Sequence, residues 1–284
     1  SIETVTLSDG YCATVRWWRP DNPRGAVLYF HGIQSHGGWY EHSGGLLAEN
    51  GLTVLMPDRR GSGRNRAQRG HVASAKRCLE DGQDALGALL EETGLPSAHV
   101  VGVSWGGKLA VALADAVGDR VRSITLVAPG LFPKVDLTAS DKFFVAMAML
   151  YEKDRLFDIP LNSPRLFTAN PRWMKFVEDD ALKLTQVTAG FLLASRRMDR
   201  TIARFPRSSW PGPVHMLLAG RDRIIHNEPT RRWLRSLSSA DRQVTEYPDA
   251  EHTLEFETDP ARFFDDLVSW IIARCEASGP TSAP

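Results

Sequence analysis

Apolar and polar positions follow two different patterns along the chain. Residues 2–7 and 11–19 alternate apolar and polar side chains around Asp9-Gly10, which is typical of an antiparallel hairpin. Later segments are short, continuous apolar runs of the kind found in strands that are buried on both faces of a parallel sheet. These predicted strands cover residues 26–30, 53–56, 99–103, 124–127 and 214–219.

Helical patterns lie between the apolar runs, and glycines stand where the first of them end. A hairpin followed by repeated strand and helix units predicts a doubly wound α/β sheet with mostly parallel strands. The expected helices cover residues 39–50, 74–92, 105–117, 229–237 and 260–275, with a further strand over residues 243–247.

The region 131–213 breaks this alternation. It has no buried-strand pattern and contains only helical stretches, over residues 140–152, 172–178 and 187–203, which prolines separate. We interpret the region as an inserted helical cap. The expected organisation is a core made of residues 1–130 and 214–276, the cap of residues 131–213, and a disordered tail of residues 277–284.

The first part of the cap is rich in aromatic and methionine side chains. Such residues can simply pack onto the main domain, or they can form the apolar underside of a lid over a binding site. The sequence leaves both interpretations open. The residues concerned are Phe143, Phe144, Met147, Met149, Tyr151 and Phe157.

Ser104 stands in the stretch Gly102-Val103-Ser104-Trp105-Gly106, between a predicted strand and a predicted helix. A nucleophilic serine requires a sharp strand-to-helix turn, and this turn needs small residues two positions before and two positions after it. Gly102 and Gly106 meet that requirement. Backbone amides at the start of the helix also point at an oxyanion that forms there. We therefore predict that Ser104 is a catalytic nucleophile.

A nucleophilic serine needs a histidine to accept its proton and a carboxylate to hold that histidine in the right tautomer. Of the eight histidines, His252 lies in a loop directly after the last predicted strand, and Asp222 lies just beyond the strand over residues 214–219. We predict His252 as the base and Asp222 as the acid. Asp222 can also be a turn residue that accepts backbone hydrogen bonds, and the alternative acids are Glu228, Asp249 and Glu251.

The loop after the strand over residues 26–30 begins His31-Gly32-Ile33. A glycine there lets the backbone turn close to a substrate, so the amide of Ile33 is expected to join that of Trp105 in an oxyanion hole. Glycine-rich loops also bind phosphate, but this one lacks the Lys-Ser/Thr pair and the GxGxxG pattern of nucleotide sites. His31, His99 and His215 lie in or beside strands and are expected to be structural.

Composition argues against several other functions. Basic and acidic residues both number 34, so no net charge attracts the chain to nucleic acid or anionic lipid. No apolar run approaches the roughly 18 residues of a membrane span, and the start has no signal-peptide pattern, so we expect a cytoplasmic protein without stable membrane insertion. Cys12, Cys78 and Cys275 are odd in number and widely spaced, which favours free thiols over a disulfide framework or a zinc site.

Four stretches carry recognisable motifs. They are His31-Gly32 with His36, Gly38 and Tyr40; residues 58–63, Asp-Arg-Arg-Gly-Ser-Gly; residues 103–107, Val-Ser-Trp-Gly-Gly; and Asn170-Pro171 with Asp180-Ala181-Leu182. Together they resemble motifs of the α/β-hydrolase superfamily and, within it, of the monoacylglycerol lipase and lysophospholipase-like group. Three positions depart from that group, with Val103 for its usual His, Trp105 for its usual Met and Ala181 for its usual Pro.

The resemblance implies an α/β-hydrolase fold, with a mostly parallel eight-stranded sheet flanked by helices and an inserted helical cap. It also implies that Ser104, Asp222 and His252 form a catalytic triad, with no metal and no organic cofactor. The expected activity is hydrolysis of a carboxylic ester with an apolar acyl group, of monoacylglycerol lipase, lysophospholipase or carboxylesterase type, through an acyl-enzyme on Ser104. The expected partner is a small-molecule ester or lipid-like substrate.

Two other classes of function fit the same residues. A thioesterase, an acyltransferase or a carbon–carbon bond hydrolase would use the same triad on a different substrate. A non-catalytic binding protein would reuse the fold alone, which an intact set of Ser, Asp and His makes less favoured. The sequence does not predict the oligomeric state.

Overall fold

A single mixed sheet forms the centre of the protein. The computed structural model describes residues 1–207 and 210–276. The sheet strands are β1 (Ile2–Thr6), β2 (Cys12–Trp18), β3 (Gly25–Phe30), β4 (Leu52–Pro57), β5 (Ala98–Val103), β6 (Val121–Val127), β9 (Val214–Ala219) and β10 (Arg242–Tyr247). Within the described ranges these eight strands lie in the order β1-β2-β4-β3-β5-β6-β9-β10.

Strand direction and burial agree with the sequence patterns. β2 is antiparallel to both β1 and β4, whereas the other neighbouring strands are parallel. Every residue of β3, β4, β5 and β9 is buried, which explains why continuous apolar runs mark these strands. The expected mostly parallel eight-stranded sheet is confirmed.

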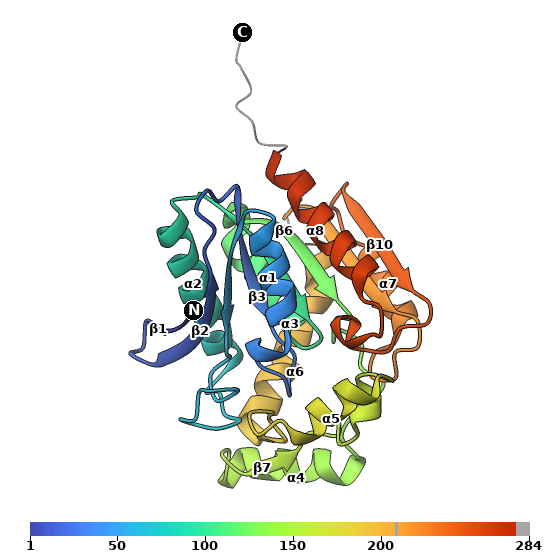
Figure 1. Cartoon of the computed structure of the whole chain (residues 1–284). Helices are drawn as coiled ribbons and strands as arrows, with labels where there is room; N and C mark the ends of the chain where they lie inside the picture. Colours follow the sequence, from blue (N-terminus) through green and yellow to red (C-terminus); the bar gives the residue numbers. More distant parts are fainter. Residues whose placement is uncertain (208–209, 277–284) are drawn as a thin grey trace.

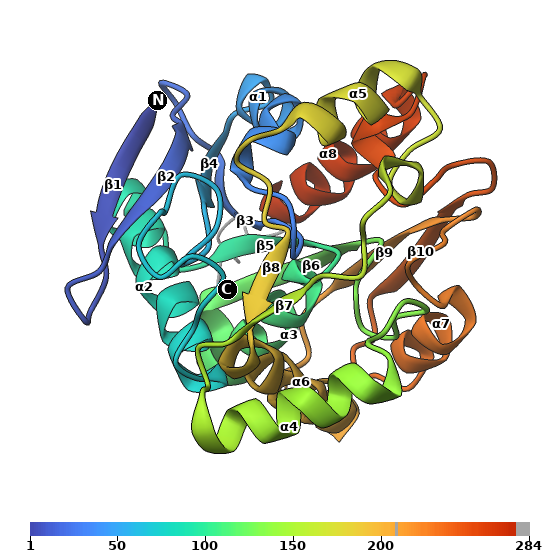
Figure 2. The same ribbon diagram turned by 90° about the horizontal axis from the view of Figure 1, so that it is seen from below.

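Helices cover both faces of the sheet (Figures 1 and 2). One face carries α1 (Glu41–Glu49) and α8 (Ala261–Glu276), and the other carries α2 (Ala75–Thr93), α3 (Gly106–Val117) and α7 (Asn227–Arg235). The helix expected from residue 39 begins only at Glu41, because a 3-10 turn, Gly37–Trp39, precedes it. In the described ranges, no helix combines the length and the apolar character that a bilayer crossing requires.

The segment 131–213 is called the insert below, and the helices α4 and α5 that Figure 1 labels in it lie beneath the sheet in that view. It contains α4 (Ala139–Tyr151), β7 (Leu156–Asp158), α5 (Pro171–Asp179), β8 (Gln186–Thr188) and α6 (Ala189–Arg204). Its boundaries as a cap stay a prediction, and the tail expected to be disordered, 277–284, lies outside the described residues.

One expectation for the insert was wrong, since it is not purely helical. β7 and β8 form a two-stranded antiparallel sheet in which Phe157 pairs with Val187. Three-residue strands are too short to produce a periodic signal, which is why the sequence pattern did not indicate them. The helix expected from residue 187 accordingly begins at Ala189, where the Thr188 hydroxyl accepts a hydrogen bond from the Phe191 amide.

Candidate active site

Ser104 lies on a sharp turn between β5 and α3, in a left-handed backbone conformation with φ +51°. This conformation costs a non-glycine residue roughly 1–2 kcal/mol, so the surrounding contacts must hold it. A Cβ atom on Gly102 would lie 2.7 Å from the Gly106 carbonyl oxygen, and one on Gly106 would lie 2.5 Å from that of Phe30. The two glycines are therefore required by direct backbone approach on either side of the serine.

Asp222 and His252, which are 30 residues apart in the sequence, are in direct contact. His252 Nδ1 donates to Asp222 Oδ2 at 2.7 Å, and the other carboxylate oxygen accepts from the amides of Ile224 and Ile225 at 2.8 and 2.9 Å. Burial disfavours the charge of Asp222, but His252 and these amides hold its pKa below the usual range. The carboxylate is thus ionised and fixes the histidine ring.

The hydrogen bond to Asp222 places the proton of neutral His252 on Nδ1 and leaves Nε2 as an acceptor. Nε2 is buried and has no hydrogen-bond partner among the described residues. Within the described residues no hydrogen bond joins Ser104 to His252. The Nε2 atom of His252 is therefore free to take a proton. Such contacts are often long in ligand-free sites and tighten only when substrate binds.

The insert helps to fix the histidine loop. The ring of Phe167 meets that of His252 edge to face at a centroid distance of 6.2 Å. The carbonyl of Phe167 also accepts a hydrogen bond from the Thr253 amide at 2.8 Å. The segment that follows α4 is therefore attached to the loop that carries the candidate base.

The alternative carboxylates lie elsewhere. Glu228 pairs with Arg231 and Arg235, Asp249 pairs with Arg221, and Glu251 pairs with Arg223. None of these three forms a hydrogen bond with His252 within the described ranges. The geometry thus favours Asp222 over each alternative acid that the sequence left open.

The backbone amides of Ile33 and Trp105 are free donors beside Ser104. Both residues line the same cavity as the serine, and neither amide donates a hydrogen bond to any described residue. A Cβ atom on Gly32 would lie 3.3 Å from the Ser104 Cβ, so the loop passes directly over the nucleophile. This arrangement is suited to an oxyanion hole.

The three histidines expected to be structural are engaged by neighbouring residues. His31 donates to the Gly32 carbonyl and accepts from the Arg59 amide, and burial lowers its pKa to about 3. His99 and His215 bond the hydroxyls of Ser123 and Thr245. All three are neutral at physiological pH, because burial also lowers the pKa of His99 to about 3 and that of His215 to about 4.

Asp180 of the insert binds residues of the loop that follows β3. Its Oδ2 atom accepts from the Trp39 indole at 2.7 Å and from His36 Nε2 at 3.1 Å. Burial opposes the charge of Asp180, but hydrogen bonds from His36, Trp39 and the Leu182 amide lower its pKa to about 2. The His36 and Asp180 motifs therefore fasten the insert to the loop that carries Ile33.

A cavity of about 450 Å³, called the main cavity below, lies between Ser104 and the insert. Its walls are mostly apolar, but Lys108 and Asp199 also face it and form an ion pair at 2.5 Å. The sequence interpretation missed Lys108, although a position one helical turn after Ser104 lies on the same helix face. The apolar lining residues include Val135, Leu137, Val145, Met149, Leu161, Val187 and Leu192.

Both interpretations of the aromatic and methionine residues of the insert hold in part. Met149 lines the main cavity, and Phe157 is buried in a small cluster with Ala148 and Ala189. The other four point away from the core: Phe143, Phe144, Met147 and Tyr151 are 61, 45, 39 and 82% exposed. α4 therefore carries apolar side chains on both its cavity side and its outer side.

Similar proteins support the fold and the family. The family model Hydrolase_4, described as serine aminopeptidase, S33, matches residues 21–259. A monoacylglycerol lipase of Mycolicibacterium smegmatis is 24% identical over 90% of this chain and 91% of its own length. A phospholipase of Bacillus subtilis, YtpA, is 23% identical over 84% of this chain and 91% of its own length.

Solved structures share the fold. A monoacylglycerol lipase of Paleococcus ferrophilus superposes with a TM-score of 0.82 at 22% identity, covering 92% of this chain and 99% of that one. A soluble variant of the monoglyceride lipase of Saccharomyces cerevisiae, in complex with a substrate analogue, gives 0.83 at 16% identity, covering 96% and 95%. At these identities the likeness shows the α/β-hydrolase fold alone.

Proposed function

The chain belongs to the serine aminopeptidase S33 family and is a serine ester hydrolase of the α/β-hydrolase superfamily; we propose that it cleaves esters of apolar acyl groups, of the monoacylglycerol or lysophospholipid type, through Ser104. The observation that carries this proposal is the contact of His252 with Asp222 at 2.7 Å, which leaves the buried Nε2 atom, unpartnered within the described part of the chain, as proton acceptor. In this proposal the main cavity, which the insert covers, receives the acyl group.

In the first half of the reaction, His252 Nε2 takes the proton of the Ser104 hydroxyl while the oxygen attacks the ester carbonyl. Asp222 stabilises the imidazolium that results, because it is ionised and bonded to Nδ1. The carbonyl oxygen becomes an oxyanion, and the amides of Ile33 and Trp105 donate to it. The imidazolium then gives its proton to the leaving alcohol, which leaves an acyl-enzyme on Ser104.

In the second half, water enters and His252 removes one of its protons as the water oxygen attacks the acyl-enzyme. The same amides stabilise the second oxyanion, and Ser104 leaves with the proton from His252. No step requires a metal or an organic cofactor.

The size and lining of the main cavity support the proposal of an apolar acyl group. Its volume of about 450 Å³ and its aliphatic walls suit an alkyl chain, because burial of each CH₂ contributes about 0.8 kcal/mol. Two relatives named a monoacylglycerol lipase and a phospholipase support a lipid-like substrate. The expected cytoplasmic location stays a prediction from the sequence.

The proposal is tested by labelling and kinetics. The wild-type protein is expected to react with a fluorophosphonate probe, and Ser104→Ala should abolish the labelling and lower ester turnover by about 10⁶-fold. Asp222→Asn is expected to lower kcat by about 10⁴-fold, because the histidine loses its orienting carboxylate. Asp249→Asn is the matched control, since its exposed carboxylate pairs only with Arg221 in the described structure.

A substrate panel separates the remaining alternatives. Monoacylglycerols, lysophospholipids, short aryl esters and acyl thioesters are compared by kcat/KM. Preference for thioesters would overturn the proposed substrate class while leaving the triad intact. Labelling that survives Ser104→Ala would instead contradict the assignment of the nucleophile.

A further inference from the structure

Arg59 connects the two residues whose amides face the oxyanion. It follows β4 in the Asp-Arg-Arg-Gly-Ser-Gly stretch, and its Nη2 atom donates to the Ile33 carbonyl oxygen at 2.8 Å. Its backbone amide donates to His31 Nε2 at 2.9 Å. One residue thus holds the loop of residues 31–33 through both its backbone and its side chain.

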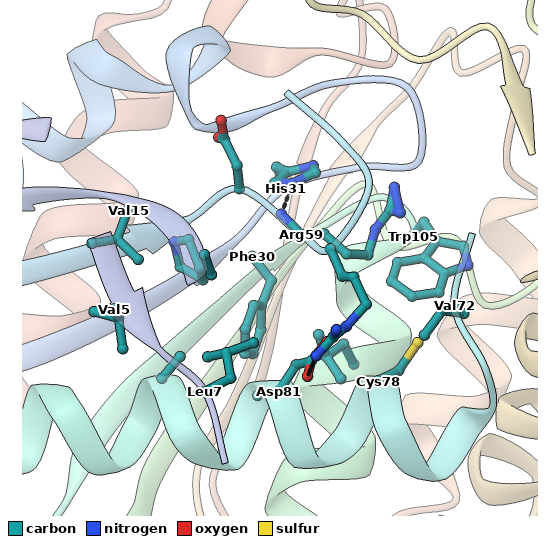
Figure 3. Close-up of a pocket in the computed structure, with 17 residues that line it drawn as sticks. Val5, Leu7, Val15, Phe30, His31, Arg59, Val72, Cys78, Asp81 and Trp105 are labelled. Carbon is teal, nitrogen blue, oxygen red and sulfur yellow. Dashed lines mark hydrogen bonds and ion pairs between the residues drawn. The ribbon is translucent and has the colours of Figure 1, made fainter. Parts of the chain in front are cut away.

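The same guanidinium lies against Trp105. Its central carbon is 4.8 Å from the centre of the Trp105 ring and 4.8 Å from that of Phe191, which comes from α6. Figure 3 shows the side chains of Arg59 and Trp105 next to each other. Guanidinium groups stack well on aromatic faces, so Arg59 restrains the residue that directly follows the nucleophile.

The charge of Arg59 is not neutralised locally. Among the described residues no carboxylate forms an ion pair with it, and its Nε and Nη1 atoms are buried without a hydrogen-bond partner. The nearest acid in sequence, Asp58, is engaged by Arg16 and by the amides of Gly37 and Arg64. Burial lowers the pKa of Arg59 to about 10, so the group remains a cation at neutral pH.

Such a group is costly for the fold. A buried donor without a partner costs about 1–3 kcal/mol, and more when it carries charge. An apolar side chain of the same length would avoid this cost and could still pack against the two rings. The cost is understandable if the cation has a use during the reaction.

Arg59 does not reach the substrate directly. It is absent from the lining of the main cavity and instead lines a small cavity of about 40 Å³ on the other side of Trp105, with Phe30, Val72 and Cys78 (Figure 3). Any effect on the reaction must therefore pass through Ile33 and Trp105 or through the field of the charge.

We infer that Arg59 is a positioning residue of the oxyanion hole, which aligns the Ile33 and Trp105 amides and places a positive charge behind them. The inference rests on the proposed function. The oxyanion exists only in the transition state and in the tetrahedral intermediates, so a group that favours it raises kcat with little effect on KM. Loss of a direct oxyanion donor costs about 10²–10³ in kcat, and an indirect loss should cost less.

The test compares Arg59→Met and Arg59→Lys with Arg60→Met. Arg60 is the neighbouring cation, but it pairs with Asp81 and Asp9. Within the described ranges no hydrogen bond or cation–π contact joins it to Ile33 or Trp105. Four quantities are measured for each variant: kcat and KM with a short aryl ester, the inhibition constant of a trifluoromethyl ketone, which forms a tetrahedral oxyanion adduct, and the melting temperature.

Arg59→Met is expected to lower kcat about 10- to 100-fold with KM nearly unchanged, and to weaken the ketone in proportion, as expected for a lost transition-state interaction. Arg59→Lys keeps the charge but not the planar stacking or its hydrogen bond geometry, so it should lie between Met and wild type. Arg60→Met should change the melting temperature alone.

Other outcomes overturn the inference. If kcat falls in proportion to the melting temperature in all three variants, Arg59 is structural. Unchanged kcat and ketone affinity in Arg59→Lys and Arg59→Met would also contradict it, and Arg59→Lys decides the matter if the Met variant does not fold. Failure of the proposed function is separate, because it appears as activity and labelling that persist in Ser104→Ala.

Discussion

Two of the helices that line the main cavity, α3 from the core and α4 from the insert, are packed very differently. In α3, nine of twelve residues are buried, from Gly106 to Ala114. In α4, Ala148 is the one buried residue of thirteen, all of them described. α3 lies between the sheet and the helices α2 and α6, whereas α4 packs mainly on α6 through a small cluster around Ala148.

The difference separates two requirements of the site. The nucleophile must be held within a fraction of an ångström, and it lies at the start of α3, which packs between the sheet and two other helices. In the proposed function the acyl group meets α4, a helix held by few buried contacts. Such helices are typical of segments that open locally at low cost. Similar apolar sequences thus serve as a rigid platform in one place and as a lightly attached cover in the other.

The largest expected effect comes from removing the space at the start of α3. Gly106→Ala would place a Cβ atom 2.5 Å from the Phe30 carbonyl oxygen and 2.7 Å from that of His31. Because both neighbours are backbone, the turn must shift and carry the nucleophile with it. We expect kcat/KM to fall by at least about 100-fold, since an ångström-scale misplacement costs that much.

Gly87→Ala in α2 is the control for this change. A Cβ atom there would meet only the Arg120 guanidinium, at 4.0 Å. Alanine favours a helix over glycine by about 0.5–1 kcal/mol, so this variant should keep full activity and gain some stability. Equal activity of the two variants would show that the turn at Ser104 is not rigid.

A matched pair of leucines tests the packing difference itself. Leu113 of α3 is fully buried and Leu150 of α4 is 73% exposed. Leu113→Ala is expected to lower the free energy of unfolding by about 3 kcal/mol, because it creates a cavity in the core. Leu150→Ala should change it by less than about 0.5 kcal/mol. Denaturant unfolding measures both, and similar losses would contradict the view of α4 as a lightly attached helix.

The smallest expected effect is a change of stability with pH, and it comes from Glu255. This carboxylate is buried in the core, whereas no described residue of α4 is a buried carboxylate. Burial raises the pKa of Glu255 from 4.5 to about 7, although its oxygens accept from the amide and hydroxyl of Ser43. Between these two values the folded protein holds a proton that the unfolded chain has released. Stability from this group is therefore complete below pH 4.5 and declines as the pH rises through 7.

Glu255→Gln mimics the protonated side chain and should remove this decline. Relative to the variant, the wild type is expected to lose on the order of 2 kcal/mol of unfolding free energy between pH 5 and pH 8. Denaturant unfolding at several pH values compares the two proteins. Parallel stability curves would show that Glu255 titrates in the folded protein as it does in the unfolded chain.

Much of the core was predictable from the sequence. The parallel strands, the turn at Ser104 and the positions of Asp222 and His252 after β9 and β10 followed from local patterns, and the strands are confirmed. The prediction of an all-helical insert was wrong, because β7 and β8 are stabilised by each other rather than by their own sequences. The roles of Ser104, Asp222 and His252 stay predictions until the variants are measured.

Short-range constraints are what the sequence by itself determined. A sharp turn requires small residues on both sides of Ser104, and a buried strand requires a continuous apolar run. Both requirements act on a few neighbouring residues, so a short stretch of sequence reveals them. Only the tertiary structure decided that Lys108 meets Asp199, 91 residues away, or that α3 is buried and α4 exposed. It also decided that Arg59 lies behind Ile33 and Trp105, because contacts between distant segments depend on how the whole chain packs.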